Sequence, residues 1–283
     1  MNAHNPLGEK VSHSRTYDPS QLFAVDRQSA REASGISDPP PFWGRDIWNA
    51  YEISWLNHRG KPVVAIGEFV FPCDTPCIVE SKSLKLYLNA FNQTRFGVVD
   101  EVAACIRKDL SACVKGNVKV SLVLPDAFET ELAVHTPQGA CIDHLDVDID
   151  TYHTDAGLLA TEDGIVKEVL YSNLLRTNCP VTEQPDWGTV IVDYRGEKIS
   201  RQSLLAYLVS YRDHTGFHEN CTEQIFSDIK ACCRPDHLTV TARFTRRGGI
   251  DINPVRTDRK PAKGSCADGS PSLDPMNLRL ARQ

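Results

Sequence analysis

The chain lacks several patterns that would assign it at once to a common class of protein. It has no run of about 18 apolar residues, which is the length that a membrane-spanning helix needs. It also has no Gly-x-Gly-x-x-Gly motif, no Walker loop and no Gly-x-Ser-x-Gly motif. These absences argue against a membrane protein and against a Rossmann dinucleotide site.

An excess of positive charge is also missing. Lys and Arg number 31 against 37 Asp and Glu, which gives a formal net charge of -6. This balance excludes a general nucleic-acid or membrane-surface binder, although a small basic pocket remains compatible with it. The first twenty residues are polar and show no secretory signal, so we expect a soluble, cytoplasmic protein.

Metal-binding patterns are scarce despite ten cysteines. Cys73 and Cys77 are spaced Cys-x3-Cys, but no second cysteine or histidine pair completes a zinc site. Without a secretory signal, the cysteines are expected to be reduced thiols, most of them buried as small hydrophobic side chains. The acidic run from Asp143 to Asp150 lacks the glycine and the terminal glutamate of an EF-hand loop. No bound metal is predicted.

The first half of the chain predicts strands followed by helices. Residues 1–40 are rich in Ser, Asp, Arg and Pro and are predicted to be an irregular arm, with regular structure beginning near Trp48. β-Branched and aromatic residues and helical spacing then predict the following elements: strands at 51–56 and 63–71, a short helix at 84–91, a helix capped by Asp100 with Val102, Ile106 and Leu110 inside, and a strand at 118–124.

The second half repeats this order. The pattern predicts strands at 168–175 and 189–194, a turn at Arg195-Gly196, a helix around 204–209, a helix opened by an Asn220/Glu223 capping box and a strand at 237–244. We therefore predict an α+β protein of two similar modules, residues 1–145 and 146–283. Residues 135–165 form the predicted joint.

The stretch from Leu175 to Gly188 is the best candidate for chemistry. Cys179 lies seven residues before Asp186, and Pro180, Pro185 and Gly188 restrict the backbone around them. A thiol nucleophile and a proton donor on one rigid loop form a working pair for covalent catalysis.

Three further clusters each allow a functional and an ordinary interpretation. Lys82 and Lys85 lie on one face of a starting helix, which suits phosphate but also describes a normal charged helix start. Glu219, if buried beside His218, would accept two N–H groups of a purine-like ring; a surface pair is the alternative. The segment 243–249 combines three arginines with two glycines, as in a phosphate site or a basic turn.

Taken together, these clusters resemble the NADPH-dependent 7-cyano-7-deazaguanine reductases of the long, bimodular type. The resemblance covers nearly the whole chain from about residue 40 and is carried by three motifs: Glu80-Ser81-Lys82-Ser83-x-Lys85-x-Tyr87, Thr177-Asn178-Cys179-Pro180-Val181-Thr182-x-Gln184-Pro185-Asp186-Trp187-Gly188, and Ser210-Tyr211-Arg212-x-His214-x2-Phe217-His218-Glu219.

The resemblance implies the tunnelling fold (T-fold), with tandem modules of an antiparallel sheet and two helices on one face. It further implies a homodimer that reduces the nitrile of free 7-cyano-7-deazaguanine to a primary amine with NADPH, in queuosine biosynthesis, without binding tRNA or metal. Cys179 would form a covalent thioimide, and Asp186, kept neutral by burial, would protonate the nitrile nitrogen.

The resemblance also assigns the binding residues. Val79, Glu80, Ser81, His218 and Glu219 would hold the deazaguanine ring. The cofactor would meet Ser81, Lys82, Arg247 and Gly248.

Two other functions remain as alternatives from the residues. A cyclohydrolase-like hydrolase on the same fold would require metal ligands, which the sequence does not show. A purine-binding or scaffold protein would leave Cys179 with a structural role. Cys221, expected in the first turn of a helix where a thiol pKa is lowered, is a second candidate for a reactive cysteine.

Overall fold

Each half of the chain folds into strands that are followed by two helices. In the computed structural model, which describes residues 16–180, 182–260 and 273–283, the first half contributes β2 (Trp43–Leu56), β3 (Pro62–Pro72), α2 (Ser81–Asn89), α3 (Val99–Val114) and β5 (Lys119–Val123). The second half contributes β8 (Thr161–Asn178), β9 (Pro185–Ile199), α5 (Arg201–Ser210), α6 (His218–Cys233), β10 (His237–Phe244) and β11 (Ile250–Thr257).

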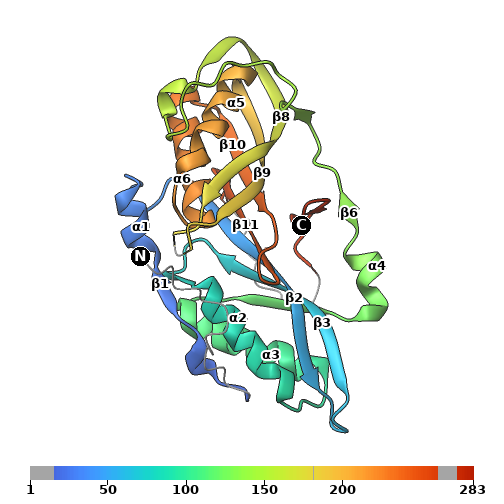
Figure 1. The fold of residues 1–283 in the computed structure, drawn as a ribbon. Helices are drawn as coiled ribbons and strands as arrows, with labels where there is room; N and C mark the ends of the chain where they lie inside the picture. The colour runs from blue at the N-terminus through green and yellow to red at the C-terminus, as the bar shows by residue number, and fades with distance from the viewer. Residues whose placement is uncertain (1–15, 181, 261–272) are drawn as a thin grey trace, which may run out of the picture.

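These strands form one continuous sheet in the order β5-β3-β2-β11-β10-β9-β8-β7 (Figure 1). All of its pairings are antiparallel except that of the short β7 (Ala140–Cys141) with β8. In each half the first strand pairs with the second, β2 with β3 and β8 with β9, and β11 joins the halves by pairing with β2. The predicted α+β architecture is confirmed.

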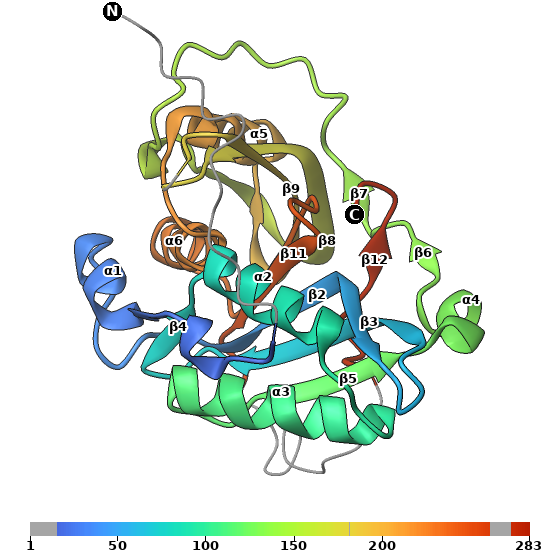
Figure 2. The ribbon, with the colours of Figure 1, turned by 60° about the horizontal axis from the view of Figure 1, so that its bottom comes forward.

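The helices bury their apolar faces against their own half of the sheet. Leu84 of α2 and Val102, Ile106 and Leu110 of α3 are fully buried against the first half, as their spacing predicts. α5 and α6 do the same over the second half, where Phe226 lies in the core. Figure 2 shows α2 and α3 on one side of the molecule and α5 beside α6.

The remaining elements are short. They comprise η1 (Pro19–Gln21), β1 (Ala24–Asp26), α1 (Arg27–Ala33), β4 (Cys77–Val79), η2 (Ala90–Gln93), η3 (Pro125–Ala127), α4 (Phe128–Glu131), β6 (Val134–His135), η4 (Ala156–Leu158), η5 (Tyr211–Asp213) and β12 (Arg279–Leu280). Within the described residues, every helix is too short or too polar to span a bilayer.

The prediction of an irregular arm was wrong for part of residues 1–40. Asp26 caps α1 by accepting a 2.7 Å hydrogen bond from the Ser29 backbone, and β1 pairs with β4. Residues 1–15 of the predicted arm lie outside the described residues. Regular structure in the body also begins earlier than predicted, at Trp43, because this end of β2 pairs with Thr257 of β11.

Three local predictions of turns and caps were also wrong. α3 begins at Val99, so Asp100 lies inside it, and the Glu101 carboxylate accepts the Gly97 N–H at 2.7 Å. Arg195 and Gly196 are part of β9, since they pair with β8. α6 begins at His218, two residues before Asn220. For Arg195 and Gly196, pairing with β8 overrides the local turn signal.

Candidate active site

The β8–β9 hairpin brings Cys179 and Asp186 together. Thr177 of β8 pairs with Asp186 of β9, and Cys179 follows two residues after Thr177. Cys179 is the first residue after β8 and Asp186 the second residue of β9, so the hairpin places both at the same end. The turn is closed by a 2.9 Å bond from the Cys179 N–H to the Gln184 carbonyl.

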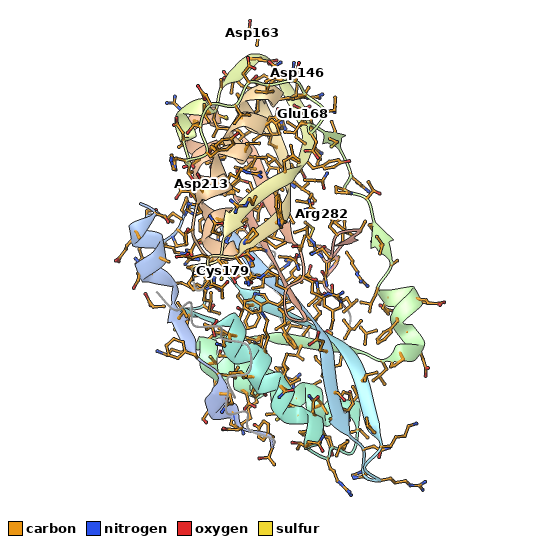
Figure 3. The ribbon with its side chains drawn as sticks, in the orientation of Figure 1. Asp146, Asp163, Glu168, Cys179, Asp213 and Arg282 are labelled. Atoms are coloured by element: carbon orange, nitrogen blue, oxygen red, sulfur yellow. The ribbon has the colours of Figure 1, made fainter. Side chains whose placement is uncertain are left out.

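The loop before α6 is hydrogen-bonded to the same strand end. The Asn178 N–H donates to the His214 carbonyl at 2.8 Å, and the Gly216 N–H donates to the Asn178 carbonyl at 3.2 Å. These bonds hold the start of α6 beside Cys179. Figure 3 places Cys179 where the two halves of the molecule meet, far from Asp146 and Asp163.

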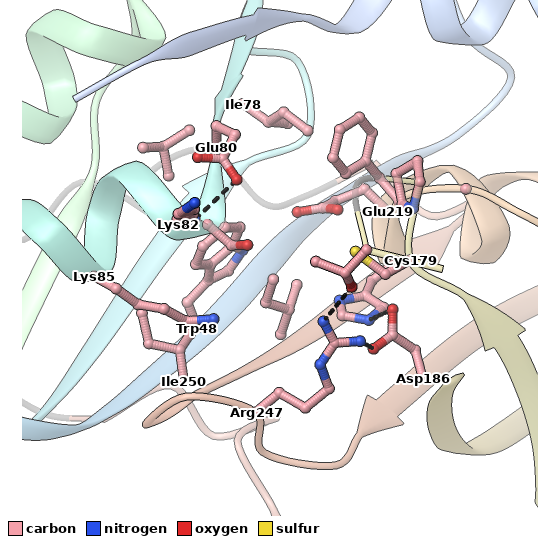
Figure 4. Close-up of a pocket in the computed structure, with 18 of the residues that line it drawn as sticks. Trp48, Ile78, Glu80, Lys82, Lys85, Cys179, Asp186, Glu219, Arg247 and Ile250 are labelled. Atoms are coloured by element: carbon pink, nitrogen blue, oxygen red, sulfur yellow. Dashed lines mark hydrogen bonds and ion pairs between the residues drawn. The ribbon is translucent and has the colours of Figure 1, made fainter. Parts of the chain in front are cut away.

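A cavity of about 170 Å³ lies at this meeting point (Figure 4). Nine of the ten predicted site residues line it: Val79, Glu80, Ser81, Lys82, Cys179, Asp186, His218, Glu219 and Arg247. The tenth, Gly248, lines a neighbouring cavity of about 120 Å³, which shares Lys85 and Ile250 with the first. The fold therefore gathers segments that are up to 168 residues apart in sequence, from Val79 to Arg247.

Asp186 is held by two basic side chains. Arg247 Nη1 contacts Asp186 Oδ1, and His218 Nε2 lies 3.2 Å from Asp186 Oδ2. Burial alone would raise the pKa of Asp186, but His218 and Arg247 outweigh burial and lower it. Burial therefore does not keep this carboxyl neutral, contrary to the expectation from the sequence, and Asp186 is a carboxylate near neutral pH.

Glu219 carries a buried acceptor without a partner. The residue is 2% exposed, and no hydrogen bond to Oε1 is present among the described residues. Its pKa is raised by burial and by the nearby Asp46 carboxylate. Figure 4 shows the Glu219 carboxylate directed into the cavity, where a ligand with N–H groups would satisfy it.

His218 is fixed beside Glu219 by packing. Its ring lies 3.9 Å from the Phe244 ring, centroid to centroid. The imidazole is thereby held between the Asp186 carboxylate and the cavity. The surface pair that was the alternative for His218 and Glu219 is not what the structure contains.

Glu80 is the N-cap of α2. Its two carboxylate oxygens accept the Lys82 and Ser83 N–H groups at 2.9 and 2.7 Å. This cap orients the first turn of α2, from which Ser81, Lys82 and Lys85 face the cavity. The Lys85 pKa is lowered by burial and by the charge of Arg247.

The turn between β10 and β11 supplies Arg247. Gly248 and Gly249 follow it with φ of 54° and 78°, which favours glycine at both positions. A Cβ on Gly248 would lie 3.1 Å from Lys85 Nζ, so glycine leaves room for close approach to this lysine. Lys82, Lys85 and Arg247 thus form a group of cations on one side of the cavity, which suits the phosphates of a dinucleotide.

Cys221 is not the reactive thiol that its helix position suggested. It is fully buried, and burial raises its pKa to about 12. The side chain faces the core, where loss of water outweighs the helix dipole. Among the described residues, no three His, Cys, Asp or Glu side chains are grouped to hold a metal ion.

Sequence reasoning missed the apolar walls of the cavity. Trp48 and Ile78 from the first half and Ile250 and Ile252 from the second line it. In the sequence these residues read as ordinary strand residues, so no local signal distinguishes them. Apolar walls, a thiol, a carboxylate and a buried acceptor in one cavity are suited to an enzyme that binds a planar ligand with N–H groups.

Comparison with known proteins identifies the family. The family described as "Nitrile reductase, 7-cyano-7-deazaguanine-reductase N-term" matches residues 13–122, and that described as "QueF-like protein" matches residues 185–263. A protein of Desulfotalea psychrophila, named NADPH-dependent 7-cyano-7-deazaguanine reductase, is 53% identical over 285 residues, covering 100% of this chain and 99% of its own. A protein of Azoarcus sp. with the same name is 55% identical, covering 89% of this chain and 90% of its own.

The chain belongs to the family of NADPH-dependent 7-cyano-7-deazaguanine reductases. The resemblance inferred from the three motifs is confirmed. The solved apo structure of the archaeosine synthase QueF-Like aligns with 35% of this chain and 99% of its own, at 21% identity and a TM-score of 0.30.

Proposed function

We propose that the chain catalyses the NADPH-dependent, four-electron reduction of the nitrile of 7-cyano-7-deazaguanine to 7-aminomethyl-7-deazaguanine, a step of queuosine biosynthesis. The observation that carries the proposal is one cavity that combines Cys179, Asp186 and Glu219, whose buried Oε1 has no hydrogen-bond partner among the described residues. The names of the relatives at 53% and 55% identity support the same activity.

Glu219 and His218 bind the base in this proposal. Glu219 accepts N–H groups from the edge of the deazaguanine, which removes the cost of its unpartnered buried oxygen. The aromatic and aliphatic walls, including Trp48 and Ile250, pack against the ring faces. Val79 and Ser81 complete the pocket, and Glu80 contributes by shaping the start of α2.

The covalent step adds the Cys179 thiol across the nitrile. The Cys179 sulfur bonds to the nitrile carbon, and one C–N π pair moves onto the nitrogen. Asp186, ionised at the start, takes the thiol proton and passes it to that nitrogen, so the thioimide forms without net proton uptake and the carboxylate is restored. Asp186 thus acts as a base and then as an acid, and its lowered pKa supplies the ionised form in which the cycle starts.

The cofactor would be held by the cationic side of the cavity. Ser81, Lys82, Arg247 and Gly248 are the proposed contacts, joined by Lys85, and the glycine turn leaves room beside Lys85. NADPH, when bound, supplies hydride. Between hydride additions the Cys179 linkage keeps the intermediate in the cavity and away from water.

We also propose the module boundary, the oligomeric state and the localisation that the family implies. The boundary between modules lies near residue 145, in the mostly irregular segment between η3 and β8. The working protein is a cytoplasmic homodimer that takes the free base and does not bind tRNA. Among the described strands β5 pairs with β3 alone, which leaves a sheet edge for a second copy.

The test is to mix the protein with 7-cyano-7-deazaguanine and NADPH and follow nicotinamide absorbance beside intact mass. We expect two NADPH oxidised per substrate, and a covalent adduct when NADPH is omitted. The Cys179→Ala variant should show neither. If the unmodified protein shows no oxidation and no adduct, the proposed function is wrong.

A further inference from the structure

A cluster of buried charges lies behind the substrate side of the cavity. The Glu223 carboxylate on α6 accepts two hydrogen bonds from Arg31 on α1, one from Nε at 3.0 Å and one from Nη2 at 2.7 Å. It also accepts two hydrogen bonds from Arg256 on β11, one from Nε at 3.0 Å and one from Nη2 at 2.8 Å. All three side chains are at least nine-tenths buried. The N-terminal helix is thereby joined to the helix that carries Glu219.

Asp46 of β2 extends the cluster toward the cavity. Arg27 Nη2 lies 2.6 Å from Asp46 Oδ2, and Arg256 Nη2 lies 2.8 Å from Asp46 Oδ1. Arg27 is further fixed by a 3.2 Å bond from Nε to Thr75 Oγ1. Asp46 and Arg27 both act electrostatically on Glu219, Asp46 opposing and Arg27 favouring its negative charge.

Glu219 lies on the same helix as Glu223 of the cluster. Glu219 precedes Glu223 by four residues, so both project from the same face of α6. Among the described residues, the guanidinium groups of Arg27, Arg31 and Arg256 face the carboxylates of Asp46 and Glu223. Within this cluster Arg27 favours and Asp46 opposes a negative charge on Glu219.

We propose that Arg27 and Asp46 are positioning residues that act through Glu219: Arg27 favours its carboxylate form and Asp46 opposes it, so this buried ion pair sets the pH below which Glu219 loses an acceptor for N–H groups. The inference rests on the proposed substrate. It gives α1 a role in substrate binding, although no α1 residue lines the cavity. A buried carboxylate without such support would take up a proton and lose an acceptor.

Other charged groups also face Glu219 from the elements packed around the cavity. They are His218 on its own helix, Cys179 and Asp186 on the β8–β9 hairpin, Arg247 on the β10–β11 turn, and Glu80, Lys82 and Lys85 on α2. His218 also carries an imidazole that can bind a proton, so the test must separate its effect on binding from that of Glu219.

The experiment measures the Kd of 7-cyano-7-deazaguanine by calorimetry between about pH 5 and pH 8, without NADPH and in a Cys179→Ala background. Below the pKa of Glu219, Kd should rise about tenfold per pH unit. Arg27→Gln removes a positive charge and should move this rise to higher pH, while Arg27→Lys should restore it. Asp46→Asn removes a negative charge and should move the rise to lower pH.

Arg45→Gln is the matched control. Arg45 neighbours Asp46 on β2 but pairs with Asp274 at 2.6 Å, and the pH of the rise should stay unchanged. Glu219→Gln should bind more weakly and without the rise; a rise that persists there belongs to His218 and overturns the inference. Shifts of Arg27→Gln and Asp46→Asn in the same direction, or no shifts, also overturn it.

The two proposals fail differently. If the Cys179→Ala parent binds no base at any pH, the proposed function is wrong and this inference with it. If the parent binds normally and the shifts are missing, the inference alone is wrong. Should Arg27→Gln fail to fold, Asp46→Asn still decides, because a purely structural role would weaken binding without moving its pH dependence.

Discussion

At the scale of single residues, the state of Asp186 matters most for the chemistry. His218 and Arg247 bind both of its oxygens and lower its pKa, so a donor that is permanently neutral is not available. A carboxylate in this place is suited to carry the thiol proton of Cys179 to the nitrile nitrogen. The residue therefore needs its charge as well as its position.

Replacing this carboxylate by an amide tests the proton transfer. We expect Asp186→Asn to slow formation of the covalent adduct by about 10²- to 10⁴-fold, because the amide keeps the shape but cannot carry a proton. The measurement is a time course of intact mass with 7-cyano-7-deazaguanine and no NADPH. Asp213→Asn, at a half-exposed carboxylate outside the cavity, serves as the control and should react like the unmodified protein. An unchanged rate in Asp186→Asn would contradict the proposed proton transfer by Asp186.

A second residue-scale prediction concerns the cysteines. Cys221 is fully buried with a pKa of about 12, so iodoacetamide should leave it unlabelled until the protein is unfolded. Cys179 should be labelled in the native state and protected by substrate, and exposed Cys232 should be labelled with or without substrate. Peptide mapping after brief alkylation reads all three sites. Native labelling of Cys221 would show that the helix dipole prevails over burial.

At the scale of elements, the starts of α2 and α6 present functional groups to the cavity, and a side-chain cap fixes the start of α2. α2 depends on Glu80, which satisfies two backbone N–H groups of its first turn. The family resemblance assigns Glu80 to the substrate, whereas its contacts in the structure are those of a helix cap. Stability measurements can separate these two roles.

Truncating the cap should cost stability. We expect Glu80→Ala to lower the free energy of unfolding by about 1 kcal/mol, and Glu80→Asp to retain much of it, since aspartate is also a good N-cap. Urea unfolding followed by tryptophan fluorescence gives the values. Glu32→Ala, at an exposed pair with Gln28 on α1, should change the free energy by less than about 0.5 kcal/mol. A weakened substrate affinity with unchanged stability would favour the binding role of Glu80 alone.

At the scale of the whole molecule, one sheet and one ion cluster join the halves. β11 of the second half pairs along β2 of the first, and Arg256 of β11 bridges Asp46 and Glu223. Burial alone would raise the pKa of Asp46 and of Glu223, but Arg256 and its partner arginines outweigh burial and lower both. The junction is therefore sensitive to acid.

The sign of this pH dependence follows from the lowered pKa values. Carboxylates with a lower pKa in the folded than in the unfolded protein contribute stability that is complete above about pH 5 and is lost as pH falls. We expect the free energy of unfolding in urea to decline progressively between about pH 5 and pH 3. A free energy that stays constant over this range would mean that the two carboxylates do not contribute.

Removing the shared arginine should be costly for the whole molecule. We expect Arg256→Met to lower the free energy of unfolding by about 3–5 kcal/mol at neutral pH, because two buried carboxylates lose their common partner. Arg201→Met, which breaks the partly exposed pair with Glu168, should cost less than about 1 kcal/mol. Similar losses in both variants would show that the cluster does not stabilise the junction.

The sequence by itself determined the α+β class, the order of strands and helices in each half, and the motifs of the site. These features are local: Val102, Ile106 and Leu110 repeat with the helical period, and Cys179 and Asp186 stand on one hairpin. Helix α1 was missed, since it is held by contacts far away in sequence, such as that of Arg31 with Glu223.

Only the tertiary structure decided the electrostatics of the site. The charge of Asp186 depends on His218 and Arg247, which are 32 and 61 residues away in sequence. The apolar walls and the cluster behind Glu219 likewise combine residues from both halves. Sequence patterns record which side chains are available and on which face of an element they lie. The protonation state of a group depends on distance and desolvation, and these are set when the chain packs.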